Sequence, residues 1–169
     1  MEQSEEEAFS GDRRSAEGGK GDGMSNLGVG YERGYGVEQN WQEAAKWYEQ
    51  GAQCGHLQSM NNLACCYEDG EGVEQNEERA LYWYRRSAEG GNGDAMCNLG
   101  RCYERGHGVE QNWQEAAKWY EQGAQCGHLQ TVRESGWEYG DSEGVAQSEE
   151  REIYWSRTRA GGGKGENLG

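Results

Sequence analysis

The sequence has no proline, no long apolar run and few basic residues, and these shortages argue against several classes of protein. No segment approaches the roughly 20 consecutive apolar residues that a membrane-spanning helix needs. The N-terminal stretch MEQSEEEAFSGDRR is acidic, whereas a secretory signal peptide begins with basic residues and continues with an apolar stretch. We therefore predict a cytoplasmic protein that does not enter a membrane.

The charge is strongly one-sided, because 16 basic residues stand against 31 acidic ones and the formal net charge is −15. Nucleic acids and anionic membrane surfaces require net positive patches on their partners, so neither is expected to bind. A basic protein surface would be attracted electrostatically. The simplest interpretation of the charge is nevertheless a soluble, self-repelling surface.

Apolar residues are also scarce, at 33% of the chain, and low hydrophobicity with high net charge is typical of disordered segments. Seven Trp and ten Tyr argue against disorder, because disordered chains are usually poor in aromatic residues. We expect an ordered but thin core, in which small residues pack around aromatic ones.

What the sequence does contain is an internal repeat. The stretch WQEAAKWYEQGAQCGHLQ begins at Trp41 and recurs without change from Trp113, and the longer segments 31–58 and 103–130 differ only at Tyr35 and His107. A weaker repeat has a period of 36 residues. It is carried by two aromatic columns, Trp47, Trp83, Trp119 and Trp155 in the first and Tyr31, Tyr67, Tyr103 and Tyr139 in the second.

This period divides the chain into four units, at 21–56, 57–92, 93–128 and 129–164. We predict that residues 1–20 form a partial unit at the N-terminus and that residues 165–169 are the start of a truncated further unit. A fixed period of this length indicates supersecondary units that stack on one another.

Each unit is predicted to contain two helices joined by a turn. In the first unit, small and aromatic residues fall at helical spacing on one face of the second helix: Trp41, Ala44, Ala45, Tyr48 and Ala52. Asn40 before this run and Glu43 three residues later match a helix-capping pattern. Gly34 and Gly36 lie between the helices, where glycine can adopt a positive φ. The first helices carry Leu and Tyr one turn apart, as at Leu27 and Tyr31.

The units share the pattern L-G-x-x-Y-x-x-G-x-G-V-x-Q-N-x-x-x-A-x-x-W-Y-x-x-x-A-x-x-G, which is clearest from Leu99 to Gly127. This pattern resembles the Sel1-like repeat, a relative of the tetratricopeptide repeat. The resemblance implies an all-α fold, a right-handed α–α superhelix (solenoid) of helix-turn-helix repeats. It also implies an adaptor or scaffold for protein complexes, with partners bound along the concave face by the first helices.

The chain departs from the family pattern at two places in the unit. The proline that often follows Gly-Val is replaced by Glu38, Glu74, Glu110 and Ala146. Gly51 and Gly123 stand inside the second helix where alanine is usual, at a cost of about 1 kcal/mol each.

The expected binding surface is the side of each first helix opposite its Leu and Tyr. It comprises Asn26, Val29 and Arg33, then Asn62, Cys65 and Asp69, then Asn98, Arg101 and Arg105, then Glu134, Trp137 and Asp141. The stacked Asn side chains could hydrogen-bond an extended peptide backbone, as in related solenoids, or they could serve a structural purpose. The arginines within an acidic chain favour a partner of mixed charge.

Candidate residues for metal binding or catalysis are few. Two Cys-x-His patterns, at 54–56 and 126–128, are two units apart and too distant to share an ion. A local zinc site would need Cys65 or Cys66 as well, and the second copy has no cysteine in those columns. No carboxylate pair stands out among the 31 acidic residues. We therefore predict no metal, no cofactor and no catalytic residue.

The main functional prediction is a non-enzymatic, monomeric interaction scaffold that binds a protein or peptide. The alternatives are a ligand-binding or β-lactamase-like member of the cysteine-rich branch of the family, or a fragment of a larger multidomain protein. That branch pairs cysteines within each unit at regular spacing, a pattern that the six cysteines here lack. Reduced thiols are the expectation.

Overall fold

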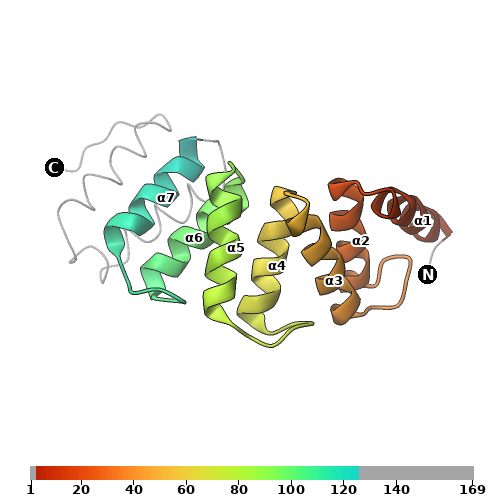
Figure 1. Ribbon diagram of the computed structural model, residues 1–169, viewed down its shortest axis with the longest axis horizontal. Helices are drawn as coiled ribbons and strands as arrows, with labels where there is room; N and C mark the ends of the chain where they lie inside the picture. Colours follow the sequence, from red (N-terminus) through yellow and green to blue (C-terminus); the bar gives the residue numbers. More distant parts are fainter. Residues whose placement is uncertain (1–2, 126–169) are drawn as a thin grey trace. The chain divides into compact units, whose positions relative to one another are not determined.

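The computed structural model describes residues 3–125, and this part of the chain is built from α-helices without strands. Seven helices follow one another, as Figure 1 shows: α1 (Gln3–Glu17), α2 (Gly21–Arg33), α3 (Trp41–Gln53), α4 (Leu57–Asp69), α5 (Glu77–Glu89), α6 (Gly93–Arg105) and α7 (Trp113–Gln125). The predicted unit at 129–164, with Trp137, lies outside the described residues.

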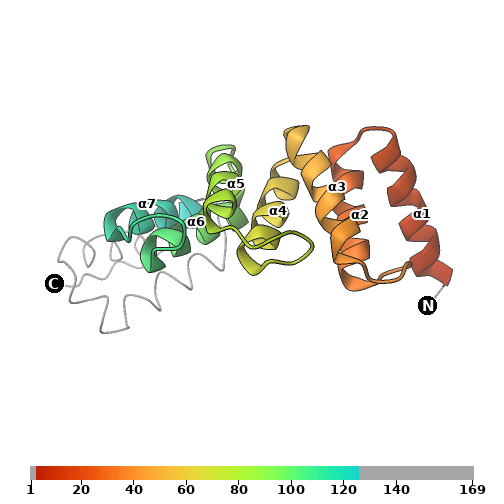
Figure 2. The ribbon, with the colours of Figure 1, turned by 60° about the horizontal axis from the view of Figure 1, so that its bottom comes forward.

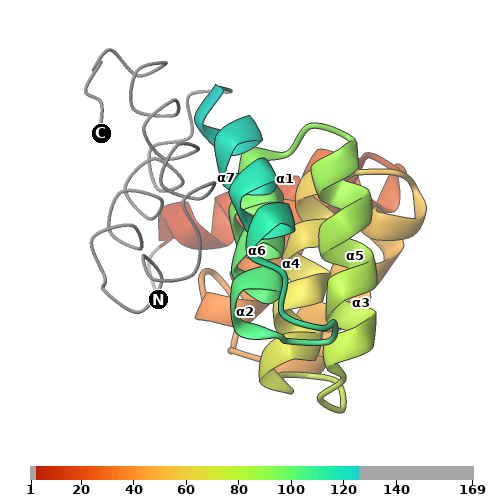
Figure 3. The ribbon, with the colours of Figure 1, turned by 90° about the vertical axis from the view of Figure 1, so that its left-hand side faces the viewer.

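The chain forms two compact units, Met1–Gly90 and Gly91–Gly169. In the first, each of the helices α1 to α4 packs against the next, and α2 also contacts α4, so the first helices of neighbouring repeats touch. Figure 2 shows α1, α2 and α3 side by side in this order. The described part of the second unit is the hairpin of α6 and α7, which pack against each other (Figure 3).

Asparagine caps start the second helix of each described repeat, as predicted. The side chain of Asn40 accepts a hydrogen bond from the backbone N–H of Glu43 at 3.1 Å, and Asn112 does the same for Glu115 at 3.0 Å. Asn76 caps α5 in the same way, although Arg79 rather than Glu occupies the third position there. The cap therefore needs only the asparagine, because its side-chain oxygen satisfies a backbone donor of the first turn.

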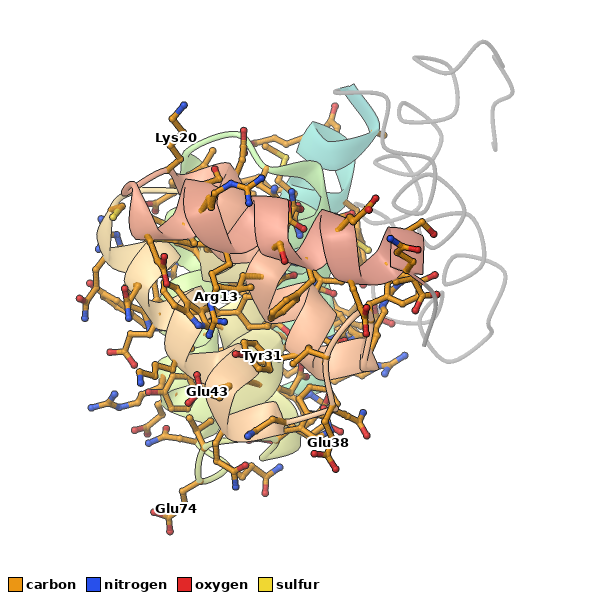
Figure 4. All side chains as sticks on the ribbon, turned by 90° about the vertical axis from the view of Figure 1, so that its right-hand side faces the viewer. Arg13, Lys20, Tyr31, Glu38, Glu43 and Glu74 are labelled. Carbon is orange, nitrogen blue, oxygen red and sulfur yellow. The ribbon has the colours of Figure 1, made fainter. Side chains whose placement is uncertain are left out.

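The Gln-Asn pair that follows each described turn has a structural explanation. The side-chain amide of Gln39 donates to the backbone carbonyl of Glu32 at 2.6 Å, and the backbone N–H of Asn40 donates to the carbonyl of Tyr31 at 2.8 Å. Gln75 and Gln111 repeat the first bond. These bonds satisfy carbonyl groups at the C-terminus of the first helix, which have no partner within the helix. Glu38 and Glu74, by contrast, project from the turns into solvent (Figure 4).

The core is a column of leucines and tyrosines surrounded by small residues. Leu27, Leu63 and Leu99 are fully buried, and so are the tyrosines Tyr48, Tyr84 and Tyr120 from the second helices. The expected packing of small against aromatic residues is confirmed at Gly28, where an added Cβ would lie 2.7 Å from a ring carbon of Tyr48. Trp47 and Trp83 of the tryptophan column, however, are only half-buried.

Gly51 has a packing partner that explains why alanine is absent from this position. An added Cβ would lie 2.7 Å from the Cβ of Ser59 in α4 and would overlap its hydroxyl. One repeat earlier the two residue types are exchanged, because Ser15 of α1 stands opposite Gly23 of α2. Each of these two contacts therefore pairs one serine with one glycine, in opposite order.

We expect Gly51→Ser to lower the free energy of unfolding by about 1–3 kcal/mol, because two serines would overfill the contact. Adding Ser59→Gly should recover at least about 1 kcal/mol of that loss, since the double variant reproduces the arrangement of Ser15 and Gly23. Urea unfolding of the two single variants and the double variant gives the coupling. Strictly additive effects would show that the two residues do not share this space.

Candidate functional site

The predicted binding face of the first helices is accessible in the first unit. On α2, Asn26 and Arg33 are exposed and Val29 is half-buried, because Leu27 and Tyr31 turn the opposite side of the helix into the core. On α4, Asn62 and Cys65 are half-buried and Asp69 is exposed. The side-chain amide of Asn62 donates to the hydroxyl of Ser25 on α2 at 3.5 Å, so these two helices present one continuous surface.

In the second unit the corresponding residues belong to α6. Asn98 and Arg101 are half-buried and Arg105 is exposed. The guanidinium of Arg101 donates to the side-chain oxygen of Asn98 at 2.7 Å, and in α4 the amide of Gln58 donates to Asn62 at 3.1 Å. Two of the three asparagines therefore already accept a hydrogen bond within their own helix. Their role in binding a peptide backbone stays a prediction.

A groove of about 320 Å³ lies beside Asn26 and Val29, between α1 and α2. Its wall is partly apolar, since Phe9 and Tyr35 contribute aromatic rings, and Tyr35 is 55% exposed. The complete lining is Ser4, Glu5, Ala8, Phe9, Asp12, Asn26, Val29, Gly30 and Tyr35. The contributions of α1 and of the turn residue Tyr35 were missed from the sequence. The signal for Tyr35 was available, because Tyr35 stands at the single position at which segments 31–58 and 103–130 differ, with His107 in the second segment.

A second hollow, of about 410 Å³, runs along α3 beside the turn at Gly72 and Val73. Its other lining residues come from one helix and are mainly polar: Gln42, Ala45, Lys46, Glu49, Gln50 and Gln53. It contains neither an exposed aromatic ring nor a residue of the predicted binding face, so we regard the groove between α1 and α2 as the better site.

Each described repeat contains a hydrogen bond between a core tyrosine and a glutamate of the first helix. The hydroxyls of Tyr48, Tyr84 and Tyr120 donate to Glu32, Glu68 and Glu104, each at 2.6 Å. Burial, followed by the hydrogen bond and charge of Glu32, raises the pKa of Tyr48 far above its usual value. The phenol therefore stays protonated and acts as a donor that joins the two helices. This is a structural contact rather than a catalytic pair.

His56 joins α2 to α4. Its Nε2 lies 2.7 Å from a carboxylate oxygen of Asp22, and its Nδ1 lies 2.9 Å from the hydroxyl of Ser59. Asp22, His56 and Ser59 thus form a chain of hydrogen bonds with the residue types of a catalytic triad. Ser59, however, is fully buried against Gly51, so its hydroxyl is not accessible to a substrate. The backbone N–H of Ser59 donates to Nδ1 at 3.3 Å, so His56 caps α4.

The cysteines within residues 3–125 are free thiols: Cys54, Cys65, Cys66, Cys97 and Cys102. Burial, and after it the negative charge of Glu32, raises the pKa of Cys66 to about 12, so this thiol is protonated and a poor nucleophile at neutral pH. In the same part of the chain, no group of three or more His, Cys, Asp or Glu side chains is arranged to hold a metal ion. None of the described helices combines the length and apolar character required to cross a bilayer.

Known proteins place this architecture in a family. The Sel1 repeat model matches residues 21–56, 57–92 and 93–128. A Sel1 repeat protein from Oxalobacter formigenes is 31% identical over 96% of this chain and 66% of its own, with a TM-score of 0.74. A protective antigen of uropathogenic Escherichia coli with an SLR fold is 31% identical over 90% of this chain, with a TM-score of 0.75.

The cysteine-rich protein B of Helicobacter pylori, at 22% identity over 55% of this chain and 71% of its own, has a TM-score of 0.53 and shares the fold. No curated protein matches the sequence. The chain spans 66% of the length of the Oxalobacter protein and 33% of that of the Escherichia coli antigen. The three matched repeats and the 31% identity over nearly the whole chain show that it belongs to the Sel1 repeat family, whose helical solenoids are generally modules for protein interaction.

Proposed function

We propose that this protein is a non-enzymatic scaffold that binds an extended protein segment along its first helices. The observation that carries the proposal is the groove between α1 and α2, because it includes two residues of the predicted binding face, Asn26 and Val29. An apolar side chain of the partner would lie against Val29, Phe9 and Tyr35. The exposed amide of Asn26 would bond to the partner's backbone.

The charges around the groove favour a partner of mixed charge. Glu5 and Asp12 line it, and the exposed Arg33 lies two helical turns beyond Asn26 on α2. A scaffold without catalysis is supported by the state of the reactive side chains: Ser59 and Cys66 are buried, and His56 is held by Asp22 and Ser59. From the groove the partner could continue along α4 past Asn62, since α2 and α4 are in contact.

The test uses peptides selected on the intact protein from a random twelve-residue display library. We expect Val29→Glu to weaken the selected peptides at least about tenfold, because a buried carboxylate would replace the apolar wall. Asn26→Ala should weaken them less, by the loss of a hydrogen bond at an exposed site. Fluorescence anisotropy of the labelled peptides measures both effects.

Gln42→Ala, on the polar hollow along α3, is the matched control and should leave the affinity unchanged. Far-UV circular dichroism confirms that each variant is folded. If Val29→Glu and Asn26→Ala bind the selected peptides as tightly as the unmodified chain does, recognition takes place elsewhere on the protein. If Gln42→Ala weakens binding as much as Val29→Glu, the binding site is the hollow along α3.

A further inference from the structure

Helix α5 differs from the other second helices on its outer side. Its residues Arg79, Tyr82, Trp83 and Arg86 are spaced at i, i+3, i+4 and i+7 and form one stripe, which we call the α5 stripe. The matching residues of α3 are Glu43, Lys46, Trp47 and Gln50, and α7 has the same four types. In α3, Lys46 and Glu43 form an ion pair with an N···O distance of 3.9 Å. The α5 stripe thus replaces a neutral set with one that carries two positive charges.

Aromatic groups, rather than carboxylates, hold both arginines. The guanidinium of Arg86 lies 5.4 Å from the ring centroid of Trp83 and 5.8 Å from that of Tyr82, and donates to the Tyr82 hydroxyl at 3.3 Å. Arg79 lies 5.5 Å from the Tyr67 ring centroid and donates to the Tyr67 hydroxyl at 3.0 Å. Within residues 3–125, neither arginine forms an ion pair. Each guanidinium has five N–H donors, so most of them remain available.

Helix electrostatics explain only one of the two arginines. Arg86 is in the last turn of α5, where the helix dipole favours a positive charge. Arg79 is near the start of the helix, where the dipole disfavours it and where Glu43 and Glu115 stand in the matching repeats (Glu43 is labelled in Figure 4). Arg79 therefore opposes the stability of its own helix. The Tyr82 ring between the two arginines is 52% exposed.

We propose that the α5 stripe binds an acidic segment of a partner protein. Two carboxylates would each accept hydrogen bonds from one guanidinium, and an apolar side chain between them would pack on Tyr82 and Trp83. Seven helical residues separate the Cα atoms of Arg79 and Arg86 by about 10.5 Å. In the polyproline II conformation, which has three residues per turn and a rise of about 3.1 Å per residue, residues i and i+3 lie on the same side of the segment, about 9 Å apart. The segment is therefore of the type Glu-x-x-Glu with an apolar residue inside.

This surface is distinct from the groove of the proposed function. It belongs to a second helix of a repeat, and none of its residues lines the groove. The two arginines of the stripe attract an acidic segment, whereas the net charge of the whole chain, −15, repels it. At a salt concentration of about 150 mM the screening length is about 8 Å, so repulsion from acidic residues farther than this from the stripe is weak, whereas Glu77, Glu78 and Glu89 of the same helix are nearer.

The experiment measures the anisotropy of the fluorescein-labelled peptide SGELAEGS at about 150 mM salt with the full chain. We expect saturable binding that falls at least about tenfold with the peptide SGQLAQGS, which has the same shape without the charges. The double variant Arg79→Glu with Arg86→Gln gives α5 the residue types that α3 has at these two positions, and it should lower the affinity for SGELAEGS by at least about tenfold.

A second double variant, Lys46→Glu with Lys20→Gln, makes the same change in net charge at exposed sites away from the stripe and should keep the affinity within about twofold. Val29→Glu should also leave it unchanged, which separates this inference from the proposed function. Circular dichroism establishes that the variants are folded. The proposal is overturned if SGELAEGS does not bind, if SGQLAQGS binds equally well, or if the two double variants weaken binding to the same extent.

Discussion

Replacing Tyr84 by alanine should lower the free energy of unfolding by about 3–5 kcal/mol, a large share of the stability of a small domain. The side chain is fully buried, and its hydroxyl donates to Glu68 at 2.6 Å. Truncation would leave a cavity between α4 and α5 and would remove the donor from the carboxylate. Urea unfolding followed by far-UV circular dichroism measures the loss.

The neighbouring residue provides the comparison. Trp83 is larger than Tyr84 but only half-buried, so Trp83→Ala should cost about 1–2 kcal/mol. Tyr84→Phe keeps the ring and removes only the hydroxyl, which should cost about 1–3 kcal/mol because Glu68 loses its partner. The order of the three variants is the result that matters. If Trp83→Ala destabilised the protein as much as Tyr84→Ala, the tryptophan rather than the tyrosine would be the core residue.

The helical spacing in the sequence already places Tyr48 on the apolar face of the second helix. Tyr48 lies four residues after Ala44 and four before Ala52, and residues four apart share one face of a helix. Both alanines are buried. Trp47 lies one position away and is displaced by about 100° around the helix. A wide apolar face can include both positions, so the sequence pattern alone does not show that Tyr48 is the more deeply buried of the two. The periodicity located the helices and turns correctly because it depends on many residues.

The bonds that join the two helices of a repeat could not be predicted in the same way. Glu32 and Tyr48 are 16 residues apart, and Gln39 and the carbonyl of Glu32 are seven apart. Both bonds depend on the path of the turn, which brings distant residues together. The outer face of the first helices could be predicted from the sequence, because it lies opposite the buried Leu and Tyr of each first helix. The groove was not predictable, because five of its nine lining residues come from α1.

Gly72→Ala is expected to lower the free energy of unfolding by about 2–4 kcal/mol, more than substitution of a turn glycine that has open space around it. Gly72 has a φ of +80°, and an added Cβ would lie 2.8 Å from the backbone carbonyl carbon of Trp41 and would overlap its oxygen. The backbone at the start of α3 cannot turn aside as a flexible side chain would. Gly36 is packed in the same way against the backbone of Glu5 in α1, so this contact is repeated from one unit to the next.

Gly55→Ala separates the two contributions to this effect. Gly55 also has a positive φ, of +90°, but an added Cβ would meet no atom within 4 Å. Its substitution should therefore cost only the conformational strain, about 1–2 kcal/mol. The difference between the two variants, measured by urea unfolding, is the contribution of the contact between the turn and α3. In Gly72→Ala, hydrogen exchange should also increase at the first turn of α3. Equal losses of stability in both variants would mean that the turn glycines serve chain conformation alone and do not set the packing of one repeat on the next.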